Sequence, residues 1–267
     1  MPAFLSLLSF LSAAAMADSI SFPPPVQDIG GPVLYSITPP ADLLINRYID
    51  GYLTESGRKT AAAILERSVP YRSFIYNMLV EKNMPPELMY LPAVESGFRA
   101  HAVSSSGAAG LWQFMMNSIS PYNITVNEWQ DDRRDFWKAT EAALHKLQHN
   151  YEKLGSWPLA LAAYNCGLGR VTRAVQSSGV TDYIDLYEMG LIPRESRLYV
   201  AKFFAFAHLA GYASRFGLEQ SSGQNDGRLS VIWDRIPLTQ AVDLRLLAAQ
   251  SGAPLAVLIE ANAELRY

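Results

Sequence analysis

The chain has 267 residues, of which 49% are hydrophobic and 18% charged, and its formal net charge is −3. This composition supports one sizeable core, with room for a small second domain. The charge provides no basic surface, so a nucleic-acid partner is excluded. The single cysteine, Cys166, excludes an intrachain disulfide, and we interpret this small side chain as a packing residue.

Residues 1–17 are apolar and end in small residues. Ala15-Met16-Ala17 has the A-x-A form of a secretory cleavage site, which predicts a signal peptide over residues 1–17 and a mature chain beginning at Asp18. The missing Lys or Arg before the apolar run departs from that pattern. A transmembrane anchor is the alternative, but the run is shorter than the ~20 residues that a spanning helix needs.

Residues 18–40 contain repeated prolines and glycines, which predict an extended lead. Residues 41–83 predict a helical lead-in of three helices. Asp42 caps the first, residues 57–67 form the second, and Ser68 caps the third, with Pro70 in its first turn. An apolar stripe at helical spacing supports the third helix: Tyr71, Phe74, Ile75, Met78 and Leu79.

A further helix is predicted from residue 85, where two prolines fit a first turn. Glu95 closes this helix, Pro92 loosens its last turn, and Gly97 stops it. A carboxyl among apolar neighbours loses hydration, which raises its pKa and suits a general acid. By itself a glutamate is more often an ordinary surface residue. The local apolar residues are Leu91, Val94, Phe98 and Trp112.

Beyond a Ser/Gly-rich loop at residues 100–110, a second helix is predicted up to Pro121. Asp135 and Ser156 then cap two longer helices, and residues 195–215 are apolar on nearly every face, as in a buried central helix. No convincing alternating strand precedes residue 229. The predicted fold class is therefore mainly α.

Residues 216–230 read as a polar linker. In residues 231–267, two short helices flank Gly252, as in a LysM-type glycan-binding module, although the last strand of such a module is missing. A helical cap on the preceding domain explains the same pattern, so a partial LysM-like module and a capping segment both stay open.

Four motifs follow one another in the chain: Glu95-Ser96, Gly110-Leu-Trp-Gln113, Ala163-Tyr-Asn165, and a late tyrosine, Tyr199, on the buried helix. In this order they resemble the family 1 lytic transglycosylases, which have an SLT domain of the goose-type, lysozyme-like fold. The tryptophan in the second motif is typical of the membrane-bound type D branch. The resemblance covers about residues 41–215 and implies a catalytic domain at residues 84–215.

The resemblance also implies the chemistry and the roles of single residues. Glu95 would protonate the glycosidic oxygen of peptidoglycan and then take the proton of the C6 hydroxyl, which leaves a 1,6-anhydro-N-acetylmuramic acid end. The acetamido group of the sugar assists, and neither a cofactor nor a metal is needed. The implied substrate-binding residues are Ser104, Gln113, Tyr164, Asn165 and Tyr199.

Most glycosidases need a second carboxylate, and the candidates by type are Asp131, Asp132 and Asp135. Because they alternate with Arg133 and Arg134, we interpret them as a solvated, self-paired cluster. His145 and His149 are four residues apart but lack the glutamate of a zincin motif, so no metal site is predicted.

Three functions remain open. The first is a lytic transglycosylase acting on peptidoglycan glycan strands. The second is a lysozyme-like or chitinase-like hydrolase, in which water replaces the C6 hydroxyl. The third is an inactive wall-binding protein. In each case we expect an exported monomer in the periplasm or at the cell envelope of a Gram-negative bacterium, with peripheral association with the envelope.

Overall fold

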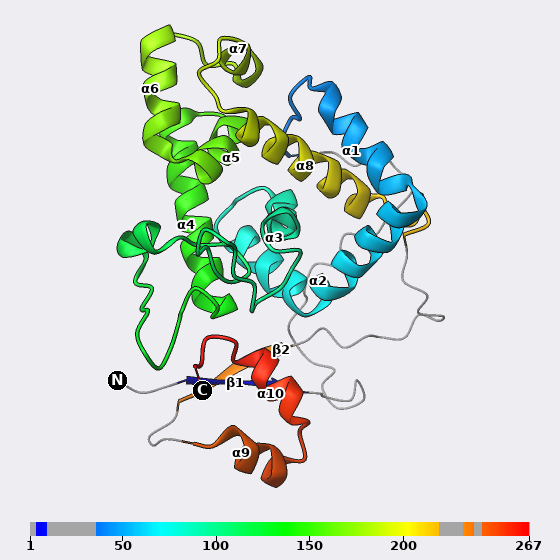
Figure 1. The fold of residues 1–267 in the computed structure, drawn as a ribbon, viewed down its shortest axis with the longest axis vertical. Coiled ribbons are helices and arrows are strands. Elements are labelled where there is room, and N and C mark those ends of the chain that lie inside the picture. The colour runs from blue at the N-terminus through cyan, green and yellow to red at the C-terminus, as the bar shows by residue number, and fades with distance from the viewer. Residues whose placement is uncertain (1–3, 10–35, 219–231, 238–241, 267) are drawn as a thin grey trace.

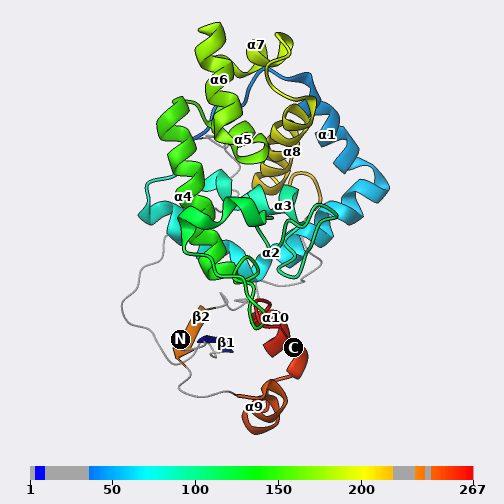
Figure 2. The same ribbon diagram turned by 60° about the vertical axis from the view of Figure 1, so that its left-hand side comes forward.

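The structure is a computed structural model that describes residues 4–9, 36–218, 232–237 and 242–266. Helices dominate these ranges, which confirms the predicted fold class. Helices α1 to α8 form one body, and the C-terminal segment with α9 and α10 lies at one end of it in both views (Figures 1 and 2). Among the described residues, no helix has the length and apolar character needed to cross a membrane.

The lead-in consists of two helices, α1 (Leu43–Leu53) and α2 (Glu55–Glu81), where the sequence predicts three. Asp42 caps α1 as expected, but α2 runs through the predicted break. Ser68 is fully buried, and its hydroxyl donates to the Leu65 carbonyl of the same helix. The buried face of α2 continues on both sides of Pro70, so packing outweighs the helix hydrogen bond that proline removes.

The next segment places the Glu95 motif. A 3₁₀ turn, η1 (Pro86–Tyr90), leads into the short helix α3 (Leu91–Glu95). The chain then stays irregular up to residue 135, apart from the 3₁₀ turns η2 (Met116–Ser118) and η3 (Ser120–Tyr122). The helix predicted between the Ser/Gly-rich loop and Pro121 is therefore wrong. Ala109 and Phe114 exchange both backbone hydrogen bonds in a bridge, which takes the groups that a helix would use.

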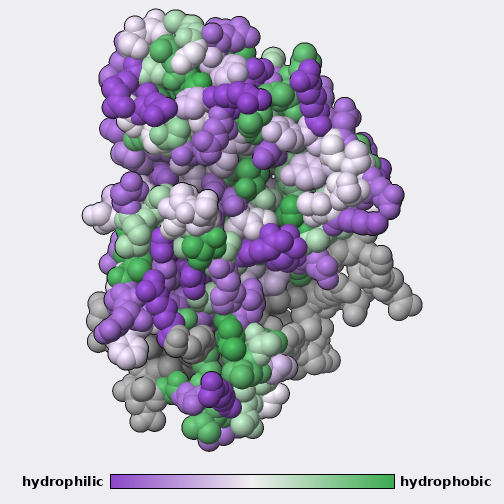
Figure 3. Space-filling model, viewed as in Figure 1, coloured by the Kyte–Doolittle hydropathy of each residue, from purple (hydrophilic) through white to green (hydrophobic). Residues whose placement is uncertain are grey.

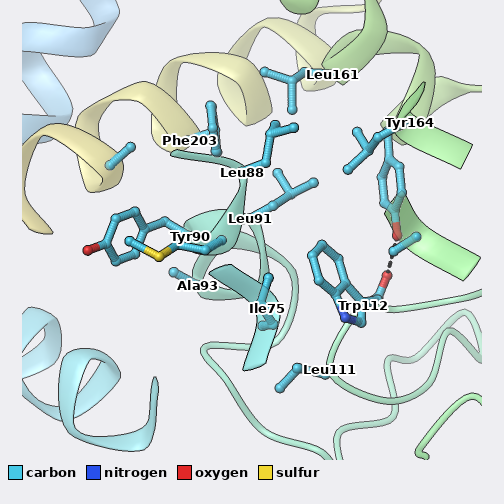
Figure 4. Close-up of a cluster of buried hydrophobic side chains, with 14 of the residues drawn as sticks. Ile75, Leu88, Tyr90, Leu91, Ala93, Leu111, Trp112, Leu161, Tyr164 and Phe203 are labelled. Carbon is cyan, nitrogen blue, oxygen red and sulfur yellow. Dashed lines mark hydrogen bonds between the residues drawn. The ribbon is translucent and has the colours of Figure 1, made fainter. Parts of the chain in front are cut away.

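Five helices complete this body: α4 (Phe136–Leu154), α5 (Trp157–Cys166), α6 (Leu168–Ser178), α7 (Tyr183–Glu188) and α8 (Arg194–Gly211). Asp135 caps α4 as predicted, with its carboxylate accepting from two backbone N–H groups. Helix α8 packs against α1, α3 and α5 and buries most of its side chains, which confirms the predicted central helix. Figure 4 shows Phe203 of α8 in one core with Leu88, Leu91 and Trp112.

The C-terminal segment contains β2 (Ile232–Pro237), α9 (Leu244–Ser251) and α10 (Leu255–Ala261). Strand β1 (Phe4–Ser9) pairs with β2 in antiparallel register, Phe4 opposite Pro237. The expectation of no strand before residue 229 is therefore wrong for residues 4–9. The predicted cleavage site, nearly all of the Pro/Gly-rich lead and most of the predicted linker lie outside the described residues. In Figure 3, hydrophobic residues gather at the lower end, over this segment.

The C-terminal segment contacts the irregular loop before α4. The Asp131 backbone N–H donates to the Glu264 carbonyl at 2.8 Å, and the Arg266 N–H donates to the Trp129 carbonyl at 2.9 Å. Two salt bridges accompany this pairing: Arg266 with Asp131 at 3.2 Å, and Arg235 with Asp135 at 2.8 Å. The C-terminal segment is thus bonded to the loop that precedes α4.

Candidate active site

Glu95 is the last residue of α3, at the point where the chain turns sharply. Ser96 caps the helix end, and Gly97 and Phe98 both have left-handed backbone angles, with φ of 62° and 57°. A glycine tolerates this conformation, whereas a phenylalanine is strained by it. The turn thereby ends the helix at Glu95 and holds its side chain at the edge of the core.

The carboxyl of Glu95 is held by a tyrosine from the central helix. The Tyr199 hydroxyl donates to Oε1 of Glu95 at 2.5 Å. Burial raises the pKa of Glu95 to about 7, although the Tyr199 hydrogen bond and the Lys146 charge both lower it. A carboxyl with a pKa near 7 is partly protonated at neutral pH, so it can give a proton and take one back.

A second tyrosine of the site, Tyr164, comes from α5. Its hydroxyl donates to the Trp112 carbonyl at 3.0 Å, as the dashed line in Figure 4 shows. Burial raises the pKa of Tyr164 and of Tyr199 well above the ordinary value, and the Glu95 charge adds to both shifts. Both tyrosines therefore stay protonated and serve as neutral hydrogen-bond donors at the site.

Ser96 connects the first motif to the second. Its buried hydroxyl donates to the Leu111 carbonyl at 2.9 Å and accepts from the Arg99 N–H at 3.1 Å. This fixes the loop around Trp112 against the end of α3. Ser96 carries no C-capping signal in the sequence, since serine is favoured at helix N-termini, so only the structure reveals this role.

Gln113 is folded onto its own loop. Its amide nitrogen donates to the Gly110 carbonyl at 2.9 Å, and its backbone is left-handed with φ of 50°. The side chain stays partly exposed. These contacts hold the amide in one orientation.

Ser104 and Asn165 are engaged elsewhere. The Ser104 hydroxyl accepts from the Ala108 N–H at 3.0 Å and closes its own turn. The exposed Asn165 accepts at Oδ1 from the buried Ser196 hydroxyl at 2.8 Å. Within the described residues, neither side chain hydrogen-bonds to Glu95. The substrate contacts expected of them therefore stay predictions.

The acidic cluster before α4 is buried, so its interpretation as solvated is wrong. Asp131 and Asp132 are each 1% exposed. Arg133 pairs with Asp131 through two hydrogen bonds and also donates to the Gly107 carbonyl. The expected self-pairing is present, and it serves to hold the loop that carries the second motif.

The described residues contain no group of three or more His, Cys, Asp or Glu side chains that could hold a metal ion.

Part of this helical body matches a known protein family. Residues 72–186 match the family described as "Transglycosylase SLT domain". Over this range the chain is similar to a transglycosylase SLT domain. This range includes Glu95, Gln113 and Tyr164, whereas Tyr199 and the whole of α8 follow it in the sequence.

The chain also has a curated relative of known type. The chain is 32% identical over 205 residues to membrane-bound lytic murein transglycosylase D of Escherichia coli (strain K12). The aligned region covers 75% of this chain and 44% of that protein. The chain thus spans less than half the length of this relative. The type D branch named from the second motif is confirmed.

Two solved structures are similar to the chain. The 70 kDa soluble lytic transglycosylase of Escherichia coli is 21% identical with a TM-score of 0.47, covering 67% of this chain and 31% of that one. The lytic transglycosylase Slt of Pseudomonas aeruginosa is 19% identical with a TM-score of 0.42, covering 56% and 25%.

One charged residue that acts on Glu95 belongs to none of the sequence motifs. Lys146, on α4, donates to the Tyr164 carbonyl at 3.2 Å, and its charge acts on Glu95. Two aromatic residues of the second motif are buried, with Trp112 and Phe114 0% and 1% exposed. The Trp112 indole N–H donates to the Thr140 hydroxyl at 2.8 Å, which ties the second motif to α4.

Proposed function

We propose that the protein is a peptidoglycan lytic transglycosylase that cleaves the β-1,4 bond after N-acetylmuramic acid without consuming water. The observation that carries this proposal is one half-buried carboxyl, Glu95, with a pKa of about 7 and a hydroxyl donor fixed on it. The similarity to an SLT domain and to the curated lytic murein transglycosylase supports the substrate class.

In the first step, protonated Glu95 gives its proton to the glycosidic oxygen and the bond to the anomeric carbon breaks. The acetamido oxygen of the same sugar attacks that carbon, so no enzyme nucleophile is required. In the second step, the Glu95 carboxylate takes the proton of the C6 hydroxyl, whose oxygen displaces the acetamido oxygen. The product is a 1,6-anhydro ring, and Glu95 returns to its starting protonation state.

A hydrolase would need a second group. An inverting glycosidase uses a separate base for water, and a retaining one usually uses a carboxylate nucleophile. The candidates by residue type are each held in an ion pair: Asp131 is paired with Arg133, Asp132 with Lys138, and Asp135 with Arg235. A transglycosylase needs none of them, because the substrate supplies both nucleophiles.

The remaining roles follow from the same proposal. Tyr199 orients the Glu95 carboxyl, and Gln113 binds the acylamino groups of the sugar. Tyr164 and Asn165 lie beside the muramyl ring, and Ser104 contacts the substrate or an assisting group. The protein acts on glycan strands as an exported monomer, peripherally associated with the envelope of a Gram-negative bacterium. A curated relative that is called membrane-bound supports the envelope location.

Mass spectrometry of digested peptidoglycan tests the reaction. We expect muropeptides lighter by one water than lysozyme products, and no label at the new ends when the digest is run in ¹⁸O-labelled water. Glu95→Gln should remove nearly all turnover, since general acid–base help is worth roughly 10²–10⁴-fold. The exposed Glu152 of α4 offers the control Glu152→Gln, which should keep full activity. Labelled reducing ends would establish a hydrolase, and intact strands an inactive wall-binding protein.

A further inference from the structure

Lys146 lies against Tyr164 and its charge acts on Glu95, but the reaction above gives it no role. Its ammonium is half-buried on α4, 4.0 Å from the centre of the Tyr164 ring and 5.7 Å from that of Phe114. It donates to the Tyr164 carbonyl at 3.2 Å. Within the described part of the chain, no carboxylate oxygen lies within 4.0 Å of this nitrogen, so the charge is not held in a close ion pair.

An ammonium in this position is costly. Two aromatic faces and one carbonyl replace only part of its hydration, and burial lowers the pKa of Lys146 while the charge of Glu95 raises it. An apolar side chain would pack against Phe114 and Tyr164 without that cost. A charge kept at such a place is expected to act on a neighbour.

The other polar groups around Glu95 are neutral or engaged. Tyr199 from α8 and Tyr164 from α5 stay protonated. At the turn that follows Glu95, Arg67 of α2 donates to the Gly97 carbonyl, and Arg99 donates to the Ser96 carbonyl. Lys146 is thus the cation whose field reaches the Glu95 carboxyl from α4.

We propose that Lys146 is a positioning residue for catalysis, whose ammonium charge stabilises the carboxylate that Glu95 becomes after the first proton transfer. The inference rests on the proposed function for its catalytic meaning. It explains how the half-buried Glu95 can become a carboxylate after the first proton transfer and stay charged until the C6 hydroxyl gives up its proton. A nearby opposite charge favours the charged form of a carboxyl.

The test compares Lys146→Met, which removes the charge, with Lys146→Arg, which keeps it. Lys153→Met, at an exposed position of the same helix, is the matched control. For Lys146→Met we expect kcat/KM to fall by about tenfold at pH 6 and by less at pH 9, because the alkaline limb of the profile moves to higher pH. Lys146→Arg should restore most of the activity, and Lys153→Met should match the wild type. A loss in Lys146→Met by the same factor at every pH would mark Lys146 as merely structural and overturn the proposal.

A second measurement does not depend on turnover. The Glu95 side-chain carboxyl can be titrated by ¹³C NMR in the wild type and in Lys146→Met, with Glu95→Gln to assign the signal. We expect its midpoint to rise in Lys146→Met and to stay unchanged in Lys153→Met. Unchanged midpoints in all variants would overturn the inference about Lys146. A wild type that titrates as expected but releases no anhydro ends would instead contradict the proposed function alone.

Discussion

The Tyr199 hydroxyl donates to Oε1 of Glu95 at 2.5 Å and joins two residues that are 104 positions apart. One partner ends a short helix at the surface of the core, and the other lies on α8, which buries most of its side chains. The hydrogen bond therefore fixes a reactive group against a helix that is packed into the core. It also lowers the pKa of Glu95 against the effect of burial.

Tyr199→Phe should lower kcat by about 10–100-fold, part of what general acid–base catalysis is worth, with little change in melting temperature. The substitution removes only the hydroxyl, so Glu95 loses its orienting donor while the ring still packs. Tyr183→Phe is the matched control, because Tyr183 is also buried and donates to the Ser196 carbonyl instead. Equal losses in both variants would show that Tyr199 acts through packing, and kinetics with a thermal melt separate the cases.

Glu95→Gln should stabilise the protein at alkaline pH. The folded-state pKa of about 7 lies above the ordinary value of 4.5, so the wild type keeps its full stability below pH 4.5 and loses stability as the pH rises through 7. Each pKa unit corresponds to about 1.36 kcal/mol, which gives roughly 2–3 kcal/mol in favour of the glutamine variant at pH 8 and almost none at pH 4. Denaturant titrations at the two pH values measure this, and a difference independent of pH would contradict it.

Gly110→Ala should destabilise the fold far more than Gly107→Ala. Both glycines have left-handed angles, with φ of 81° and 85°, so alanine is strained at either position. A Cβ at Gly110 would lie 1.7 Å from the Arg133 carbonyl oxygen, whereas at Gly107 nothing lies within 4 Å. We expect a further loss of at least about 2 kcal/mol at Gly110. Similar melting temperatures for the two variants would show that the loop moves away from Arg133 freely.

Removal of residues 219–267 tests whether the C-terminal segment is a separable wall-binding module or a cap. The contacts of Arg235 with Asp135 and of Arg266 with Asp131 favour the cap, since their loss leaves buried carboxylates with fewer partners. We expect the shortened chain to melt several degrees lower and to lose activity on soluble glycan strands. A module would leave both unchanged and weaken only the binding to whole sacculi.

The sequence predicts the structure correctly at positions where local interactions determine it. Asp42 and Asp135 cap helices as their type and place indicate, and the apolar residues of α8 bury that helix. It fails where distant contacts decide. Packing carries α2 through Pro70, and the burial of Asp131 depends on Arg133 and on residues beyond 260.

At the site, the motifs identify Glu95 and Tyr199, which the structure joins directly. Lys146 could not be found in this way. It lies on α4 between the second and third motifs, and an isolated lysine on an amphipathic helix gives no signal until the neighbouring helices are placed around it.

The left-handed backbone of Gln113 implies a conflict between heat resistance and function at this residue. A non-glycine residue held at φ of 50° costs of order 1–3 kcal/mol, and asparagine or glycine would bear the same turn more easily. Laboratory evolution for thermal tolerance alone should therefore replace Gln113. Selection for growth that depends on wall turnover should restore the glutamine, because the proposed sugar contact uses the amide that Gln113 holds on the Gly110 carbonyl.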